Sequence, residues 1–213
     1  MDKQLLKTVV ALAAALVLAA CSEAPKPAAP SAKTEAEPEK KAPEPTGPIA
    51  ARTAFFEMYK PARAWAADLL PLSLTSGEVA GIVNAGGKAG LWTAVFVSPS
   101  RREARTFTYA VADQGGTIHK GVSAEVAQPW TGATAKSRPF QVTGFAVNSD
   151  DAYKAALAKA SAWVRAHPGR KVSMTLVNDP RFPAPAWYVL WGNRGSGYLA
   201  FVNAVTGTAM NPH

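Results

Sequence analysis

The clearest hydrophobic pattern along the chain lies between residues 150 and 166, where apolar side chains recur every three or four positions. These side chains would form one face of a helix: Tyr153, Ala156, Leu157, Ala160, Trp163 and Val164. Ser149 stands at the expected N-cap, and Asp150 and Asp151 place negative charge at the positive end of the helix dipole. Pro168-Gly169 ends the pattern. The spacing therefore predicts a helix over residues 150–166.

Short apolar segments on both sides of this helix predict β-strands. Those after it are Lys171–Val177, Ala186–Trp191, Tyr198–Val202 and Ala204–Met210, and the one before it is Phe140–Val147. In the first half of the chain the predicted strands are Glu78–Val83, Leu91–Val97, Arg105–Ala112 and Thr117–Val126. A first helix is predicted to begin at Pro61, because proline is tolerated at the first helical position. Its apolar face would hold Ala62, Trp65, Ala66, Leu69 and Leu70.

The two halves show a similar order of predicted elements. Trp92-Thr-Ala-Val-Phe-Val in the first half matches Trp187-Tyr-Val-Leu-Trp in the second, and a Gly-Thr pair follows in both. We interpret the folded region as two diverged strand–helix–three-strand units, each an antiparallel sheet with one helix on a face, which is an α+β fold. The predicted boundaries are residues 49–135 and 136–213. Because the two halves share few identical residues, the alternative is that their similarity arose by chance.

The second half also resembles a PepSY-type repeat, a small module with a helix, antiparallel strands and a last hairpin that carries Thr-Gly. The residues behind this resemblance are Tyr198-Leu-Ala-Phe-Val-Asn-Ala-Val-Thr-Gly-Thr-Ala-Met. Asn203-Ala204-Val205 stands where those modules carry an acidic residue. PepSY modules occur in bacterial envelope proteins and protease propeptides, so the resemblance implies a regulatory or inhibitory binding module rather than an enzyme.

The N-terminus has the organisation of a secretory signal. Lys3 and Lys7 are followed by the short apolar segment Thr8–Ala20, which fits a signal-peptide core and is too short for an ordinary membrane span. The segment ends in Leu18-Ala19-Ala20-Cys21, which resembles the lipobox of bacterial lipoproteins. The resemblance implies cleavage after residues 1–20 and lipidation of Cys21. An ordinary secretory signal with a chance cysteine is the alternative.

Residues 21–48 predict a disordered linker after the lipidated cysteine. This stretch is rich in Pro, Ala, Glu and Lys and has no Leu, Val, Ile or aromatic residue, so it has little apolar surface with which to form a core. Frequent proline favours an extended spacer. Ser22, rather than Asp, follows the cysteine, which resembles the sorting pattern of outer-membrane lipoproteins. We therefore expect a lipid anchor, most simply in the outer membrane and facing the periplasm.

Charge and residue usage narrow the chemistry further. The chain has 213 residues with 23 Lys+Arg against 15 Asp+Glu, a formal net charge of +8. Its one cysteine and three histidines offer few ligands for a metal centre, and we expect no cofactor. The basic excess favours an anionic partner. Because the chain is expected to be secreted, a nucleic-acid partner is not expected. An anionic envelope component or an envelope protein is expected instead.

Candidate binding residues are arginines and tryptophans in predicted turns and strand ends. Arg101, Arg102 and Arg105 lie close together in one predicted hairpin, and Arg194 occupies the corresponding hairpin of the second half. Guanidinium groups bind carboxylates and phosphates with two parallel hydrogen bonds. Trp130 in a linker and Trp191 at a strand end are the tryptophans most expected at the surface. A solvated hairpin whose charges prevent aggregation is the alternative for the arginines.

The function these features favour is that of a non-catalytic, membrane-anchored envelope lipoprotein that serves as a periplasm-facing binding or regulatory module. A hydrolase that acts on the cell wall is one alternative, and a pocket joining Asp113, Glu125 or Asp179 to a histidine would support it. An assembly partner of outer-membrane machinery is the other. The sequence shows no nucleophile motif of the Gly-x-Ser-x-Gly type.

Overall fold

The computed structural model describes residues 47–211, which fold into a main antiparallel sheet, a separate two-stranded antiparallel sheet and two α-helices. The helices are α1 (Ala51–Trp65) and α2 (Ser149–Ala166), and a 3-10 turn spans Val142–Gly144. The strands of the first half are β1 (Ile49–Ala50), β2 (Leu70–Gly77), β3 (Lys88–Ala89), β4 (Leu91–Ser98), β5 (Glu103–Ala110), β6 (Gly121–Ala124) and β7 (Gln128–Pro129). Those of the second half are β8 (Val172–Val177), β9 (Ala186–Trp191), β10 (Tyr198–Asn203) and β11 (Ala209–Met210). The predicted α+β class is confirmed.

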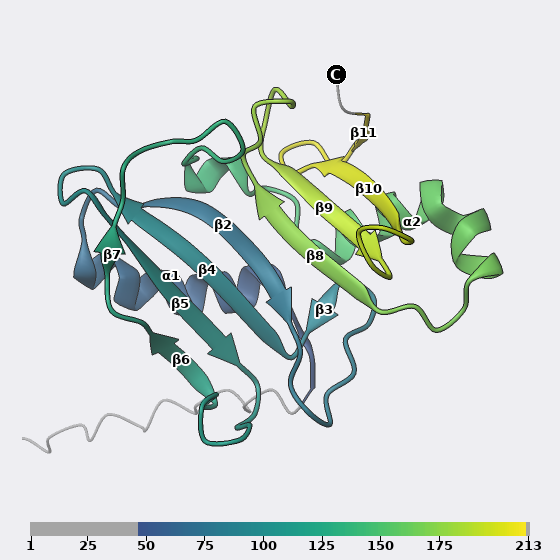
Figure 1. The fold of residues 1–213 in the computed structure, drawn as a ribbon, viewed down its shortest axis with the longest axis horizontal. Coiled ribbons are helices and arrows are strands. Elements are labelled where there is room, and N and C mark those ends of the chain that lie inside the picture. The colour runs from purple at the N-terminus through teal and green to yellow at the C-terminus, as the bar shows by residue number, and fades with distance from the viewer. Residues whose placement is uncertain (1–46, 212–213) are drawn as a thin grey trace, which may run out of the picture. The chain divides into compact units, whose positions relative to one another are not determined.

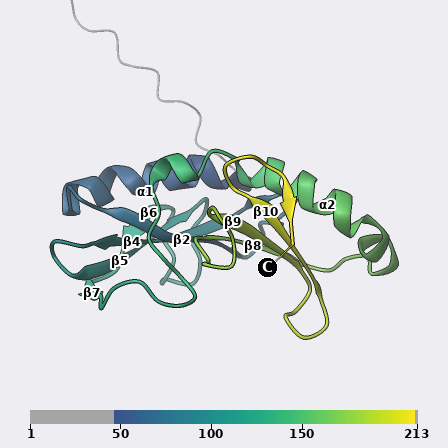
Figure 2. The ribbon, with the colours of Figure 1, turned by 90° about the horizontal axis from the view of Figure 1, so that it is seen from above.

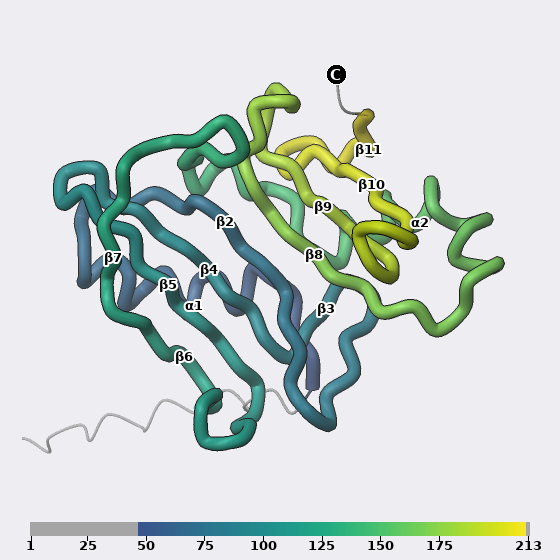
Figure 3. The backbone as a smooth tube through the Cα atoms, in the orientation of Figure 1, coloured from purple at the N-terminus to yellow at the C-terminus, as the bar shows by residue number. Residues whose placement is uncertain are grey.

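The main sheet is continuous across both halves of the chain. Its strand order is β11-β10-β9-β8-β2-β4-β5-β6, with β7 pairing a second stretch of β5. The halves meet where β2 pairs with β8, with Leu74 opposite Leu176. The expected half-sheets are therefore joined edge to edge, as the path of the chain shows (Figures 1 and 3).

Both helices lie against the same face of this sheet (Figure 2). From α1, Ala54, Phe55 and Met58 point into the interface and are fully buried. From α2, Ala152, Ala156 and Ala160 do the same. Small residues on α2 let its backbone approach the sheet closely, and the large residues Trp187 and Trp191 fill the space from the strands. One hydrophobic core results, and it contains residues of both halves.

The two helices begin next to each other, and the start of α2 caps α1. The backbone N–H of Ala51 donates to Ser149 Oγ at 2.8 Å, and that of Arg52 donates to Asn148 Oδ1 at 3.0 Å. The residue before α1 makes no side-chain cap of its own. Asn148, and not Ser149, is the N-cap of α2. The predicted cap residue therefore serves the other helix.

The prediction for the first helix was wrong in its limits. The helix begins at Ala51, and Pro61 lies inside it. The ten residues before Pro61 form the helix because Ala54, Phe55 and Met58 bury against the sheet, which outweighs the hydrogen bond that proline cannot donate. Leu69 and Leu70, expected on the helix face, lie before and in β2.

Two predicted strands do not form, and two others are shorter than expected. Residues 78–83 make a loop closed by a bridge between Val79 and Ile82. Residues 140–147 contain the 3-10 turn instead of a strand. Phe140 and Phe145 reach the core, but the segment makes only isolated backbone hydrogen bonds, such as that from Phe140 N–H to Pro71 O, and no strand ladder. The strand predicted over 117–126 is reduced to β6, and that over 204–210 to β11. The helix over 150–166 and the strands at β4, β5, β8, β9 and β10 are confirmed to within a few residues.

Candidate binding face

The sheet face opposite the helices is uncovered in the described part of the chain, and Figure 1 looks onto it. Because side chains alternate between faces along a strand, those between the buried positions point away from the helices. One row crosses the face from strand to strand in register: Ser123, Thr108, Thr93, Thr75, Thr175, Tyr188, Phe201 and Met210. Six of these eight side chains carry a hydroxyl group, so the face offers both hydrogen-bonding and apolar contacts.

Over β8, β9 and β10 the uncovered face is hollowed into a groove with a volume of about 770 Å³. Its floor consists of outward-facing strand residues, namely Ser173, Thr175, Val177, Tyr188, Leu190 and Leu199. Its rim consists of loop residues, namely Ala135, Lys136, Asp179, Arg181, Arg194 and Gly197. The volume lies in the range of small-molecule and cofactor sites. We call this feature the β8–β10 groove.

At one end of the β8–β10 groove, Asp179 holds Arg181 in place. The Arg181 guanidinium donates to both carboxylate oxygens, through Nε at 3.1 Å and through Nη2 to Oδ2 at 2.8 Å. Nη2 also donates to the Tyr188 hydroxyl at 3.0 Å, and that hydroxyl donates to Asp179 Oδ2. Only 7% of Asp179 is exposed. The three side chains therefore form a closed hydrogen-bonded set.

This set shifts the acidity of all three groups. Hydrogen bonds from Arg181, and then from Tyr188, hold the pKa of the Asp179 carboxyl far below its usual value. Hydrogen bonding to Asp179 raises the pKa of the Arg181 guanidinium further. Burial, with a hydrogen bond to Asp179, raises the pKa of Tyr188 to about 12. At neutral pH Asp179 is ionised, Arg181 is charged and Tyr188 keeps its proton.

Sequence reasoning named Arg194, and Asp179 as a candidate carboxylate, but missed Lys136, Tyr188 and the hydrogen bonds that join Asp179 to Arg181 and Tyr188. Arg194 lies in the turn between β9 and β10 and does line the groove. The signal that could have found the rest is the alternation along β8–β10. It leaves Leu190 and Leu199 on the face away from the core, and 43% of Leu199 is exposed.

The predicted arginine cluster of the first half is engaged in structural contacts at two of its three positions. Arg101 donates through Nη1 to Trp65 O at 3.0 Å, pairs with Glu103 at 3.1 Å and stacks over the Trp65 ring. Arg105 donates through Nε to Glu125 O at 2.8 Å. Within residues 47–211 the guanidinium of Arg102 has no hydrogen-bond or ion-pair partner. The structure thus leaves Arg102 as the cluster's unengaged cation.

The two tryptophan candidates differ in exposure. Trp130 is half-buried, and its backbone N–H donates to Arg102 O at 2.8 Å. Trp191 was predicted at the surface, and this is wrong: it is 2% exposed. Its ring packs against Tyr153 of α2 and Tyr198 of β10, because its place in β9 faces the helices. Cys21, the predicted lipidation site, lies outside the described residues.

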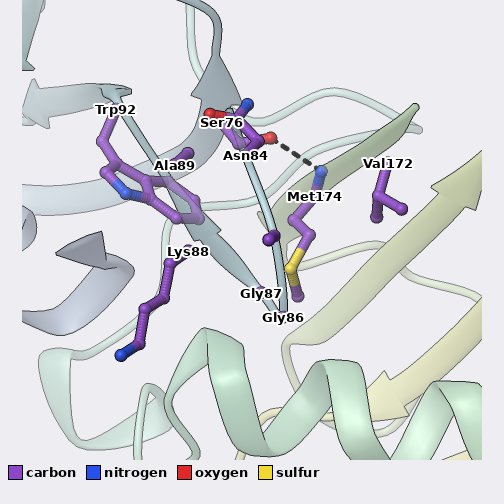
Figure 4. A pocket seen from close by; sticks show the side chains of 10 residues that line it. Ser76, Asn84, Gly86, Gly87, Lys88, Ala89, Trp92, Val172 and Met174 are labelled. Atoms are coloured by element: carbon purple, nitrogen blue, oxygen red, sulfur yellow. Dashed lines mark hydrogen bonds between the residues drawn. The ribbon is translucent and has the colours of Figure 1, made fainter. Parts of the chain in front are cut away.

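A second hollow lies on the side of the helices, beside the glycine-rich loop before β4 (Figure 4). Its accessible volume is about 10 Å³, room for one water molecule at most. Ser76 Oγ accepts the backbone N–H of Met174 there at 2.8 Å. A Cβ on Gly87 would lie 2.4 Å from Ser149 O, so the glycine lets the loop pack against the start of α2.

The carboxylates that would support a hydrolase are dispersed. Asp113 lies 3.7 Å from His119, but both side chains are about 70% exposed in a hairpin. Asp179 is bound by Arg181 and Tyr188. Residues 47–211 contain no group of three or more His, Cys, Asp or Glu side chains able to hold a metal ion.

Comparison with known proteins gives one solved structure. No protein family matches the chain, and neither does any curated protein. The chain is similar to the crystal structure of a protein described as a "putative lipoprotein (CD1622)" from Clostridium difficile 630. The TM-score is 0.45 at 8% sequence identity, over 75% of this chain and 91% of that chain. Neither helix of the described region is long and apolar enough to cross a membrane.

Proposed function

We propose that this chain is a non-catalytic lipoprotein of the bacterial envelope that binds a partner with the uncovered face of its sheet. The observation that carries the proposal is the one-sided fold. Both helices cover one face, and the other face presents half-exposed hydroxyl and apolar side chains around a groove of about 770 Å³. A sheet face of this kind is typical of an interaction surface.

The two halves are proposed to be diverged copies of one PepSY-like unit. Each half has a helix followed by its long strands, and β2 and β8, the first strands after the helices, pair with each other. Trp92 and Trp187 each occupy the second position of the next long strand, β4 and β9. These matched positions support a duplication that placed two units side by side in one sheet.

The lipid anchor at Cys21 would hold this module at the membrane, most simply the outer membrane, with the linker as a spacer. Several acyl chains retain a protein on a bilayer where one chain binds only marginally. An anionic envelope component or envelope protein fits the basic charge of the chain, which is +8 overall.

Site-specific photo-crosslinking in intact cells tests the binding face. A photoreactive amino acid at Thr93 or Thr108, on the uncovered face, should give a discrete crosslinked species. The same group at Lys60, exposed on α1, is the control and should not give that species. Crosslinks from Lys60 but from neither threonine would overturn the proposed face.

The anchor is tested separately by cell fractionation. Cys21→Ser should move the protein out of the membrane fraction and leave unprocessed precursor, because the lipobox thiol is the acylation site. Recovery of the mature wild-type protein in the soluble periplasmic fraction, without detergent, would contradict the anchor.

A further inference from the structure

Three cationic groups surround the β8–β10 groove, and one acid faces them. Lys136, Arg181 and Arg194 line it, and Asp179 is the acid. Asp179 is already neutralised by Arg181, so the groove keeps a formal charge of +2. Within the described region neither Lys136 Nζ nor the Arg194 guanidinium has a hydrogen-bond or ion-pair partner. Arg181 uses Nε and Nη2 on Asp179 and Tyr188 and has further N–H donors on Nη1.

The cations stand at opposite ends of the groove. Lys136 belongs to the turn that leads to Arg138, whose backbone N–H bonds Asn178 O just past the end of β8. Arg194 lies in the turn that begins at Gly192, whose N–H bonds Lys171 O just before the start of β8. The six residues of β8 separate these ends by roughly 15–20 Å, at about 3.3 Å per residue. Figure 1 shows the two turns beyond opposite ends of β8 and β9.

The floor between these charged ends is apolar and hydroxylic. Leu190 and Leu199 are directly opposite each other on β9 and β10, and Ser173 and Thr175 of β8 lie beside them. A ligand matching this arrangement has negative charge at both ends, apolar side chains on one side and hydrogen-bonding groups along its length.

We propose that the β8–β10 groove binds an extended peptide segment that carries acidic residues near both ends and apolar residues between them. The inference rests on the proposed binding face and names its ligand. In an extended peptide every second side chain points to the same side. Acidic residues six positions apart are therefore about 20 Å apart on one side, with two intervening side chains directed at successive levels of the floor, one at Leu190 and Leu199 and the next at Tyr188.

Charge placement favours a peptide over a single anionic headgroup. A fatty acid or an inorganic phosphate would satisfy the cations at one end of the groove and leave those at the other end unpaired. The hydroxyls of Ser173 and Thr175 can also bond the amide groups of a peptide, which an acyl chain lacks. The fixed position of Arg181 supplies a prearranged carboxylate site at one end, since Asp179 and Tyr188 orient its guanidinium.

The test measures binding of a fluorescent peptide, acetyl-Glu-Thr-Leu-Thr-Leu-Thr-Glu-amide, to the purified mature protein by fluorescence anisotropy. The matched peptide with both Glu replaced by Gln should bind at least tenfold more weakly. The double variant Lys136→Gln/Arg194→Gln should also weaken binding at least tenfold, and added salt should reduce the difference. Arg181 is left in place because its removal would strand the buried Asp179 charge.

The matched control is Lys60→Gln/Arg165→Gln, which removes the same charge from exposed positions on the two helices. It should bind the Glu peptide within twofold of the wild type. Leu199→Asp is a second groove variant and should abolish binding by adding negative charge to the floor. Unfolding midpoints establish that each variant is folded.

Equal binding of the Glu and Gln peptides, or unchanged binding by the groove variants, would overturn the proposal. Displacement of the peptide by laurate or inorganic phosphate at equal concentration would also overturn it, in favour of a small anion. If the wild-type chain does not bind the peptide but still crosslinks from Thr93, the proposed binding face is supported and only the proposed peptide ligand is wrong.

Discussion

Trp92 and Trp187 meet edge to face in the core, with ring centroids 6.3 Å apart and planes at 74°. Each donates its indole N–H at 2.9 Å to a backbone carbonyl just ahead of a helix: Trp92 to Ile49 O and Trp187 to Val147 O. Both acceptors stand two residues before the first residue of α1 or α2. The pair therefore fixes where both helices begin and joins the two halves at one aromatic contact.

The first prediction is that Trp92→Phe and Trp187→Phe destabilise the fold by similar amounts, about 2–3 kcal/mol each. Each change leaves a backbone carbonyl, buried at Ile49 and part-buried at Val147, without its indole donor and leaves a cavity beside the other ring. Urea unfolding followed by circular dichroism measures this, with the half-buried Trp65→Phe as control. A loss below about 0.5 kcal/mol in either core variant would contradict the matched roles.

A second prediction concerns the cap that α2 provides to α1. Ser149→Ala removes the acceptor for the Ala51 N–H and should lower the free energy of unfolding by about 1–2 kcal/mol. The control is Ser161→Ala, an exposed serine in the same helix, which should change stability by less than about 0.5 kcal/mol. Because the cap joins the two helices, equal effects would show that the contact contributes nothing.

Local patterns predicted the helix and the long strands of the second half, although the strand expected at Phe140–Val147 did not form. The helix at 150–166 and the strands at Ala186–Trp191 and Tyr198–Val202 follow the spacing of their apolar residues, and the structure places them within a residue. In the first half, Pro61 was read as a helix start because its local cost is high in a helix interior. Burial of Phe55 and Met58 against the sheet overrides that cost, and burial against distant strands is not visible in a local window.

The candidate site was less predictable because it depends on pairing between distant strands. Arg194 could be named from its turn, but its partners across the groove come from residues 136 and 181. The pairing of β2 with β8, which makes one sheet, is equally non-local. Trp191 was misplaced for the same reason: its position at a strand end is local information, whereas the face it occupies is set by α2.

A third prediction follows from the position of Pro61. Pro61→Ala should stabilise the protein by about 1–3 kcal/mol, because it restores the hydrogen bond to Glu57 O and removes a ring clash within the helix. Greater freedom of the unfolded chain offsets part of this gain. Thermal unfolding measures the change. An unchanged or lower midpoint would mean that the helix bends at Pro61 to fit the sheet.

A fourth prediction concerns acid. The Ser98 hydroxyl, and then the Ser100 N–H, lower the pKa of Asp68 from 3.8 to about 2. Because the folded pKa lies below the unfolded one, the stabilisation is complete above about pH 4 and is lost as the pH falls through about 2. Asp179 shifts in the same direction. Between pH 6 and pH 2, the free energy of unfolding measured with urea should fall less for Asp68→Asn than for the wild type. Equal falls in the two proteins would contradict the lowered pKa of Asp68.

The last prediction separates structure from binding in the arginine hairpin. Arg101→Gln should lower stability by about 0.5–1 kcal/mol, since it loses the bond to Trp65 O at the end of α1 and the contact with its ring. Arg102→Asn should leave stability unchanged, because asparagine tolerates the φ of 53° found there. If this hairpin meets an anionic envelope partner, Arg102→Asn should weaken low-salt recovery of that partner, and the effect should fade as salt rises. The opposite result would reverse the two roles: Arg101→Gln would keep wild-type stability and recover less of the partner, whereas Arg102→Asn would recover as much as the wild type.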